Sequence, residues 1–154
     1  MNIGIILNHL SFSELNYRVI SEINRYVQTT TDGISILCDN ISNRLIEPSC
    51  AVVDTALAPS ITEGVLIAFD LSGALTLRRA YCPAKKLLFV WNLEWIYGNL
   101  GYNTLYETLT DKNIKLITRN EAYARVIENL VGRKPEYLLE EFTMEKINEI
   151  CRAE

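Results

Sequence analysis

Short apolar runs alternate with helical patterns along almost the whole chain, and this alternation restricts the fold more than any other feature. The runs are apolar at successive positions, which is typical of strands buried on both faces of a sheet. Strands separated by helices favour parallel pairing through right-handed crossover connections. We therefore expect an α/β fold with a mostly parallel sheet of about six to seven strands. The expected strands are Asn2–Leu7, Ile34–Cys38, Cys50–Val53, Gly64–Phe69, Lys86–Trp91, Ile114–Thr118 and Glu136–Leu139.

The length of the chain is consistent with one domain. It has 154 residues, of which 49% are hydrophobic. A chain of this length buries roughly 70% of its unfolded surface, which is enough for one stable core. The sequence has no internal repeat, low-complexity tract or linker composition. We therefore predict a single Rossmann-like, three-layer domain over residues 1–154.

The helix after the first strand has the clearest local pattern. Ser11 and Glu14 have the spacing of a capping box, with Ser11 as the N-cap, and Leu10 with Leu15 that of a hydrophobic staple. Apolar residues then recur at helical spacing, which predicts one buried face. That face consists of Leu15, Val19, Ile20, Ile23 and Val27.

Further helices are predicted from their end signals. Ser72, Asn120 and Thr143 are candidate N-caps, and Gly132 is a candidate C′ residue. Only a weak helical pattern covers Ile41–Ser49. The expected helices run from Ser72 to about Tyr81, from about Asn103 to Leu109, from Asn120 to Val131, and onward from Thr143.

Charge and cysteine spacing argue against several classes of function. The formal net charge is −4, which disfavours a nucleic-acid binder that relies on a basic surface. The four cysteines lie far apart, a spacing that suits neither a zinc site nor a disulfide framework. We expect reduced, buried thiols, no metal and no resident cofactor. The cysteines are Cys38, Cys50, Cys82 and Cys151.

Hydropathy predicts a cytoplasmic protein without a membrane span. No apolar run reaches the roughly 20 residues that cross a bilayer. Residues Met1–Leu7 form a strand pattern and lack the basic leader of a signal peptide.

Polar residues follow nearly every predicted strand. Ligands of open parallel sheets bind beyond the carboxyl ends of the strands, so these residues are candidates for a site. The same residue types also form helix N-caps and turns, so each has a structural alternative. The residues are Asn8, His9, Asp39, Asn40, Asp54, Asp70, Ser72, Asn92, Glu94, Thr118, Arg119 and Asn120.

Three strand-end residues are candidates for acid–base catalysis, namely His9, Asp70 and Glu94. An imidazole titrates near neutral pH, so His9 is a candidate base toward a hydroxyl group. The alternative for this lone histidine is a surface or capping residue. The candidates for substrate binding are Asn8, Ser72, Trp91, Asn92, Trp95, Arg119 and Asn120.

The sequence carries no phosphate-binding motif. Neither G-x-G-x-x-G nor G-x-x-x-x-G-K-[ST] occurs, so no dinucleotide or P-loop cradle is expected. Arg119, beside the predicted helix start at Asn120, is the best candidate for an anion contact. A local basic cluster is interpreted as a solvated helix end. It consists of Arg78, Arg79, Lys85 and Lys86.

The segment after the fifth strand is rich in aromatic residues. Trp91, Trp95 and Tyr97 occur there with Asn92 and Glu94. These side chains suit a platform that stacks on a sugar or base ring. They equally suit a plug at the end of the core, or a patch for a dimer.

Three segments of the chain resemble GT-B glycosyltransferases. Leu87–Trp95 resembles a central strand with its loop, and Ile117–Tyr123 resembles the last parallel strand and helix of the amino-terminal domain. Lys134–Phe142 resembles the strand that leads into the second domain. The resemblance covers the amino-terminal, acceptor-side domain only, and phage-encoded or bacterial sugar transferases are the nearest comparison.

The resemblance implies a sugar transferase, or the acceptor half of one, that acts with a partner chain. A nucleotide-sugar is the donor that the resemblance implies for a catalytic chain. GT-B enzymes bind that donor mainly on a second domain. The resemblance implies that this second domain would begin at about Glu154, the last residue of the sequence. The E-x7-E spacing of retaining members has no weight, because it occurs at Glu14–Glu22, Glu128–Glu136 and Glu141–Glu149.

Two other hypotheses stay open beside an active transferase. One is a non-catalytic binding module that keeps the GT-B half-fold and docks a protein or a second copy. The other is a small flavodoxin-like interaction or homodimerisation domain without sugar chemistry, since one fold supports many functions.

Overall fold

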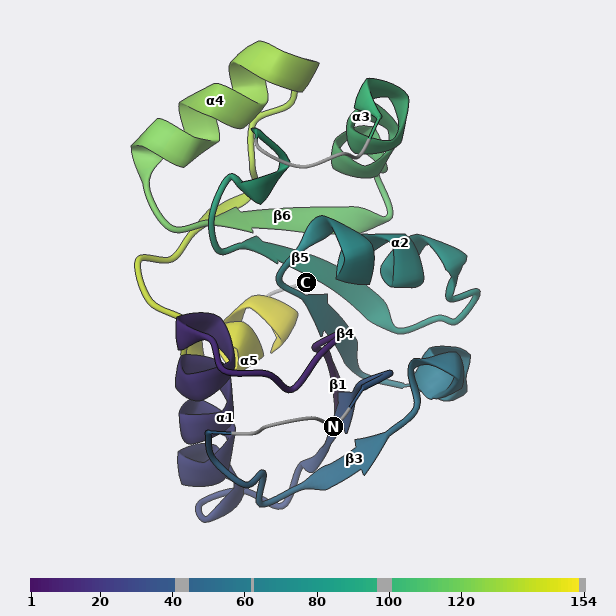
Figure 1. The fold of residues 1–154 in the computed structure, drawn as a ribbon, viewed down its shortest axis with the longest axis vertical. Helices are drawn as coiled ribbons and strands as arrows, with labels where there is room; N and C mark the ends of the chain where they lie inside the picture. The colour runs from purple at the N-terminus through teal and green to yellow at the C-terminus, as the bar shows by residue number, and fades with distance from the viewer. Residues whose placement is uncertain (41–44, 62, 97–100, 153–154) are drawn as a thin grey trace.

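A sheet of seven parallel strands forms the centre of the computed structural model, which describes residues 1–40, 45–61, 63–96 and 101–152 (Figure 1). Its strand order is β3-β2-β1-β4-β5-β6-β7. The strands are β1 (Asn2–Ile6), β2 (Gly33–Leu37), β3 (Ala51–Val53), β4 (Val65–Ala68), β5 (Lys85–Val90), β6 (Ile114–Thr118) and β7 (Tyr137–Leu138). The predicted Rossmann-like α/β fold is confirmed, and the sheet is entirely parallel.

Helices cover both faces of the sheet. α1 (Glu14–Val27) and α5 (Met144–Arg152) lie together on one face. The other face carries α2 (Leu71–Arg79), α3 (Tyr102–Thr110) and α4 (Glu121–Val131), with two short 3₁₀ helices, η1 (Thr55–Ser60) and η2 (Glu94–Ile96). This three-layer arrangement follows from the crossover rule, because each parallel connection must return over one face.

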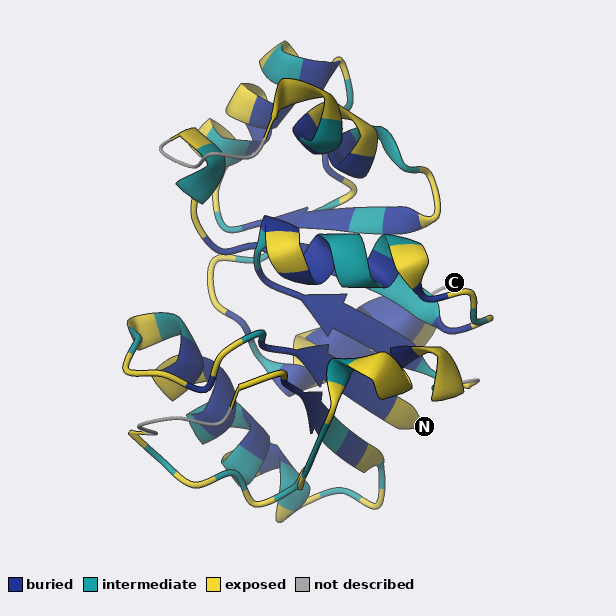
Figure 2. Cartoon of the chain, turned by 45° about the vertical axis from the view of Figure 1, so that its right-hand side comes forward, coloured by how far each residue is buried: buried dark blue, intermediate teal, exposed yellow. Residues whose placement is uncertain are grey.

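The strands are buried on both sides, as their uninterrupted apolar runs predict (Figure 2). Successive residues point to opposite faces, so Ile5 packs with α1 and α5, while Ile6 packs with α2. All of β4 is fully buried. Burial of each such aliphatic side chain contributes about 1.5–3 kcal/mol, which makes the central strands the main source of stability.

The strand order reverses between β1 and β4. β1 pairs with β2 on one side and with β4 on the other, with Ile3 opposite Val65 and Ile6 opposite Ala68. The first connections therefore build the sheet toward β3, and the later ones build it toward β7. Crossovers leave this point toward opposite faces, and open α/β sheets bind their ligands at such a switch point.

The start of α1 differs from the prediction. Ser13 is the N-cap and accepts a 3.1 Å hydrogen bond from the Asn16 N–H, so the cap predicted at Ser11 is wrong. The amide of Asn16 donates to the carbonyl oxygens of His9 (2.7 Å) and Ser11 (3.0 Å). These bonds hold Ser11 in the loop, so the helix begins two residues later than predicted. Leu10 and Leu15 therefore do not have the positions relative to the N-cap that a hydrophobic staple requires.

The other helix ends are partly as predicted. Asn120 caps α4 by accepting from the Tyr123 N–H at 2.9 Å, and Gly132 ends it in the left-handed region. The cap predicted at Ser72 is wrong, because Asp70 caps α2 and leaves Ser72 exposed in the first turn. α5 begins directly after Thr143, as expected. Of the weak pattern at 41–49, residues 41–44 lie outside the described residues, and 45–49 form no helix.

The cysteines are all free. Cys38 and Cys151 are buried, as predicted, whereas Cys50 and Cys82 are only half-buried. Burial is still sufficient to raise the pKa of the Cys50 thiol. The helices in the described ranges are too short or too polar to cross a bilayer.

Two glycines with positive φ give a matched test of the fold. Gly64 has φ 116°, and a Cβ there would lie 1.8 Å from the carbonyl oxygen of Asn2 on β1. Gly132 has φ 70°, and a Cβ there meets no other atom within 4 Å. We expect Gly132→Ala to cost about 1 kcal/mol of unfolding free energy and Gly64→Ala about 3 kcal/mol or more. Urea unfolding measures both, and equal losses would contradict the close approach to β1.

Candidate functional site

The carboxyl ends of β1 and β4 bring together residues that lie far apart in the sequence. The side-chain amide of Asn8, after β1, donates to both carboxylate oxygens of Asp70, after β4, at 3.0 and 3.2 Å. Asp70 also accepts from the backbone N–H of Gly73 at 2.6 Å as the N-cap of α2. Cap and site candidate are therefore the same residue.

Glu94 joins this pair from η2. Its Oε1 accepts a 3.2 Å hydrogen bond from the backbone N–H of Leu71. Asp70 and Glu94 thus place two carboxylates at the N-terminus of α2, where the helix dipole stabilises negative charge. We call Asn8, Asp70 and Glu94 the switch-point cluster.

The carboxyl group of Glu94 has an unusual proton affinity. Burial raises its pKa to about 7, and the charge of Asp70 adds to this, while the hydrogen bond from Leu71 opposes it. The group is therefore close to half-protonated at neutral pH. A strongly raised pKa is typical of functional residues, and Glu94 lies at the edge of the sheet where ligands of parallel sheets bind.

The other predicted acid–base residue lies apart. His9 is exposed, and within the described residues its imidazole makes no hydrogen bond or ion pair. Its backbone pairs with Asn40 as an isolated bridge, which fixes the loop rather than the ring. A catalytic role for His9 stays a prediction without a contact to support it.

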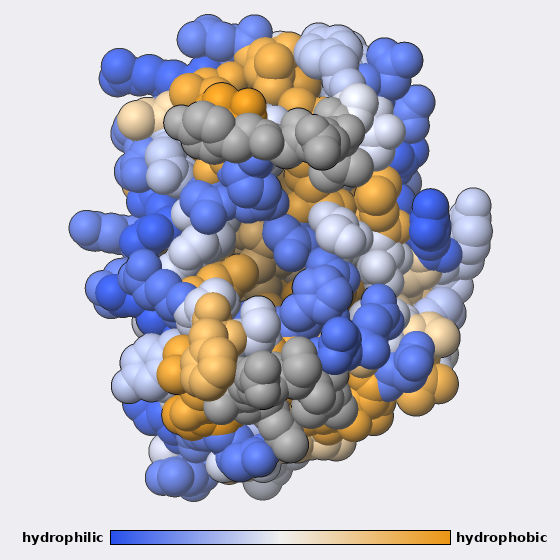
Figure 3. Space-filling view, viewed as in Figure 1, coloured by the Kyte–Doolittle hydropathy of each residue, from blue (hydrophilic) through white to orange (hydrophobic). Residues whose placement is uncertain are grey.

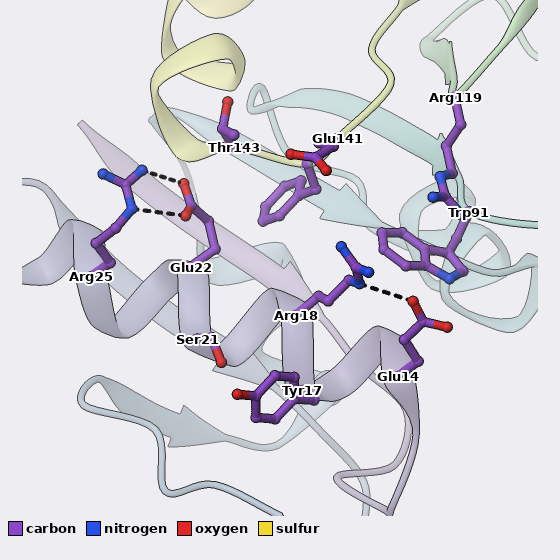
Figure 4. Close-up of a pocket in the computed structure, with 11 residues that line it drawn as sticks. Glu14, Tyr17, Arg18, Ser21, Glu22, Arg25, Trp91, Arg119, Glu141 and Thr143 are labelled. Carbon is purple, nitrogen blue, oxygen red and sulfur yellow. Dashed lines mark hydrogen bonds and ion pairs between the residues drawn. The ribbon is translucent and has the colours of Figure 1, made fainter.

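Trp91 and Arg119 lie at a second place on the carboxyl edge (Figure 4). The guanidinium of Arg119 stacks over the Trp91 ring, 4.4 Å from the ring centre. Both line a cavity of about 480 Å³ between α1 and the segment that precedes α5, which we call the α1 cavity. Its lining consists of Glu14, Tyr17, Arg18, Ser21, Glu22, Arg25, Trp91, Arg119, Glu141, Phe142 and Thr143.

The two tryptophans do not form one platform. Trp91 is buried and packs beside Phe89 in the core under α1 and α5, with 6.1 Å between ring centres. Trp95 is half-buried against the opposite core, under α2 and α3. Its indole N–H is buried, and no described residue accepts from it. Tyr97, the third aromatic residue of the predicted platform, lies outside the described residues.

The remaining candidates for substrate binding have structural or solvent-exposed positions. Asn120 is used as the N-cap of α4. Ser72 and Asn92 are exposed, and their side chains make no hydrogen bond within the described part of the chain. The observed contact of Asn120 is therefore that of a helix N-cap, which is the structural alternative to a binding role.

Several residues of the α1 cavity were missed by the strand-end rule. Tyr17 and Arg18 lie within a helix, so no strand end points to them, and only the packing of α1 across the sheet brings them to the edge. Glu141 follows β7 and obeys the same rule as the predicted candidates. The sequence pattern could have included Glu141 but not the two helix residues.

The β1–α1 loop is not built as a phosphate cradle. It contains no glycine, and Asn16 fills the loop with bonds to the carbonyl oxygens of His9 and Ser11. The α2 N-terminus is occupied by the carboxylates of Asp70 and Glu94. Among the residues that the structure describes, no three His, Cys, Asp or Glu side chains gather as metal ligands.

The chain is a Rossmann-like α/β domain with two chemically different groups of polar side chains at the carboxyl ends of its strands. Comparison of the chain with protein-family models, curated proteins and solved structures finds no match. Function is therefore inferred from the geometry of the carboxyl edge.

The raised pKa of Glu94 predicts a pH-dependent stability. An unfolded Glu94 titrates near 4.5 and the folded one near 7, so folding binds a proton between these values and stability falls as pH rises through that window. We expect Glu94→Gln, which keeps the acceptor for Leu71, to stabilise the protein by about 1 kcal/mol at pH 8, after solvent screening of this half-buried group. At pH 4 to 5 the variant and the parent should unfold alike in thermal melts. Glu128→Gln on the exposed face of α4 is the control, and a Glu94→Gln effect that is equal at both pH values would contradict the raised pKa.

Proposed function

We propose that this chain is a glycosyltransferase-like, acceptor-side domain that binds a hydroxyl-rich ligand at the switch-point cluster and acts with a partner chain. The observation that carries the proposal is the Glu94 carboxyl, whose pKa is raised by burial to about 7 beside Asp70 at the reversal of strand order. The place is the one at which open α/β sheets bind their ligands.

The groups at the switch point select for hydroxyls rather than phosphates. The carboxylates of Asp70 and Glu94 already occupy the N-terminus of α2, so a phosphate there would meet like charges. Carboxylate oxygens accept hydrogen bonds from hydroxyl groups, and the Asn8 amide adds both a donor and an acceptor. A neutral polyol such as a sugar fits this set of groups.

Glu94 supplies the chemistry that a sugar acceptor needs. When ionised, it accepts the proton of the acceptor hydroxyl as that oxygen bonds to the anomeric carbon of the donor sugar, whose bond to the nucleoside diphosphate breaks so that the diphosphate leaves on the partner chain. A pKa near the working pH favours this transfer, because the base is present in its ionised form and still binds the proton well. Asp70 accepts hydrogen bonds from Asn8 and from the Gly73 N–H, so its role is to position the cluster and not to take up the proton.

The donor is assigned to a partner chain. The β1–α1 loop has no backbone cradle for a diphosphate, and the switch-point cluster is acidic. One wall of a crevice does not enclose two substrates or exclude water from them. The nucleotide-sugar therefore binds elsewhere, and this domain contributes the acceptor and its base.

Thermal shift with neutral sugars tests the proposal. A panel of glucose, galactose, mannose, N-acetylglucosamine and maltose should include at least one ligand that raises the melting temperature by a few degrees, because binding stabilises only the folded state. The increase should be lost in Glu94→Gln and kept in Glu128→Gln, an exposed control on α4. UDP-glucose and GDP-mannose alone should produce no comparable shift.

The converse results are decisive. No response to any neutral sugar, or the same response in Glu94→Gln as in the parent, would contradict sugar binding at the cluster. A shift with a nucleotide-sugar that persists in Glu94→Gln would contradict assignment of the donor to a partner.

A second candidate function is homodimerisation through the end of the molecule formed by η2 and α3. Ile96, Tyr102 and Tyr106 are 57%, 58% and 43% exposed there, and the rings of the two tyrosines lie 6.0 Å apart. Figure 3 shows apolar atoms at the surface of the end of the molecule where α3 and α4 lie. Clustered exposed aromatic residues are typical of protein interfaces.

Light scattering tests that second function. A dimer should be abolished by the paired change Tyr102→Ser and Tyr106→Ser, whereas Tyr17→Ser on α1, an equally exposed aromatic residue, should leave it intact. Trp95→Ala would not test this interface, because Trp95 packs against the core and its loss would also destabilise the fold. A monomeric parent protein at high concentration would contradict homodimerisation.

A further inference from the structure

The α1 cavity lies on the opposite face of the sheet from the switch-point cluster. Trp91 belongs to the core under α1 and α5, whereas the segment around Glu94 packs against the core under α2 and α3. The cavity has a volume of about 480 Å³, which is within the range of small-molecule sites. The proposed function makes no use of it.

Arg119 is held in a fixed position above Trp91. Its guanidinium lies 4.4 Å from the ring centre, and its Nε donates to the carbonyl oxygen of Glu140 at 3.4 Å. The indole below is only 7% exposed and is fixed by the core. Because the stack and the Nε bond orient the side chain, its outer nitrogens form a pre-organised fork for an oxyanion.

Arg119 has no carboxylate partner among the described residues, in contrast to the two other arginines of the cavity. Arg18 pairs with Glu14 at 2.9 Å, and Arg25 pairs with Glu22 at 2.8 Å and with Glu145 at 2.7 Å. An isolated cation in a concave, partly desolvated position attracts an anion more strongly than a solvated one.

Arg18 extends from α1 and lines the same cavity as Arg119 (Figure 4). Its ion pair with Glu14 is solvent-exposed, with 50% and 67% of the two side chains accessible. Such pairs contribute little to stability, so a ligand can displace Glu14 at small cost. Two guanidinium groups from different elements, those of Arg18 and Arg119, then line the same cavity.

We infer that the α1 cavity is a binding site for a small ligand that carries a single carboxylate, with Arg119 as its principal contact. The cavity lining contains three arginines and three glutamates, so its formal charge is balanced. Glu141 and Glu22 oppose a second negative charge, which disfavours phosphate monoesters and diphosphates. Tyr17, an exposed side chain of the lining, supplies aromatic surface for the body of the ligand.

Matched pairs of probes test the inference by isothermal titration calorimetry. Glucuronate against glucose, and benzoate against benzamide, differ mainly in the carboxylate, and glucose 6-phosphate adds a doubly charged comparison. At least one carboxylate should bind at millimolar concentrations or below, about tenfold more tightly than its neutral partner and than glucose 6-phosphate. Arg119→Gln should weaken this binding about tenfold, and Arg125→Gln, an exposed arginine of α4 outside the cavity, should leave it unchanged.

Arg119→Lys keeps the positive charge but removes the two-pronged guanidinium group. It therefore tests whether binding weakens in a variant that still folds. It should fold as the parent does and still bind the carboxylate several-fold more weakly. Failure of both carboxylates to bind, or equal binding by Arg119→Gln and Arg125→Gln, would overturn the inference. Carboxylate binding without any response to neutral sugars would support this site while contradicting the proposed function, so the two can fail separately.

Discussion

The common direction of all seven strands is the constraint on which the rest of the structure depends. Because every strand is parallel to its neighbours, each connection must cross a face as a helix, and every strand ends at the same edge. This brings Asn8 into contact with Asp70, although 62 positions separate them. Polar side chains then gather where the backbone of the sheet is no longer paired, which makes this edge the natural place for chemistry.

The sequence predicts the sheet well because the strands are buried on both faces. Such a strand must be apolar at every position, so its run stands out without knowledge of its neighbours. Helix starts are harder to predict, because several residues near one end can cap it. At α1 the competition between Ser11 and Ser13 is decided by the bonds of Asn16, and at α2 Asp70 is favoured over Ser72, with Asn8 bonded to its carboxylate. Those contacts depend on the folded chain, whereas the Asn120 cap and the Gly132 terminus are local and are predicted correctly.

The strand-end rule finds individual site residues but not their grouping. It selects Asp70 and Glu94, which meet at the start of α2, and Trp91 and Arg119, which stack, as candidates. It does not show that these pairs lie on opposite faces, because side-chain direction beyond a strand is set by the loop and not by the two-residue period of the strand. The rule does not select Arg18, because this residue lies within α1 and reaches the cavity only through the packing of α1 on the sheet.

The two sites differ in the sign of their free charge, and the sheet keeps them apart. At the α2 N-terminus the helix dipole and backbone N–H groups compensate two carboxylates, and burial keeps one of them partly protonated. Over Trp91 a guanidinium is compensated by an aromatic face and a carbonyl oxygen, with no described carboxylate beside it. The segment around Glu94 packs with the core under α2 and α3, whereas Arg119 stacks on Trp91 in the core under α1 and α5. The core of the sheet therefore separates these opposite charges, and neither group has an ion-pair partner among the described residues.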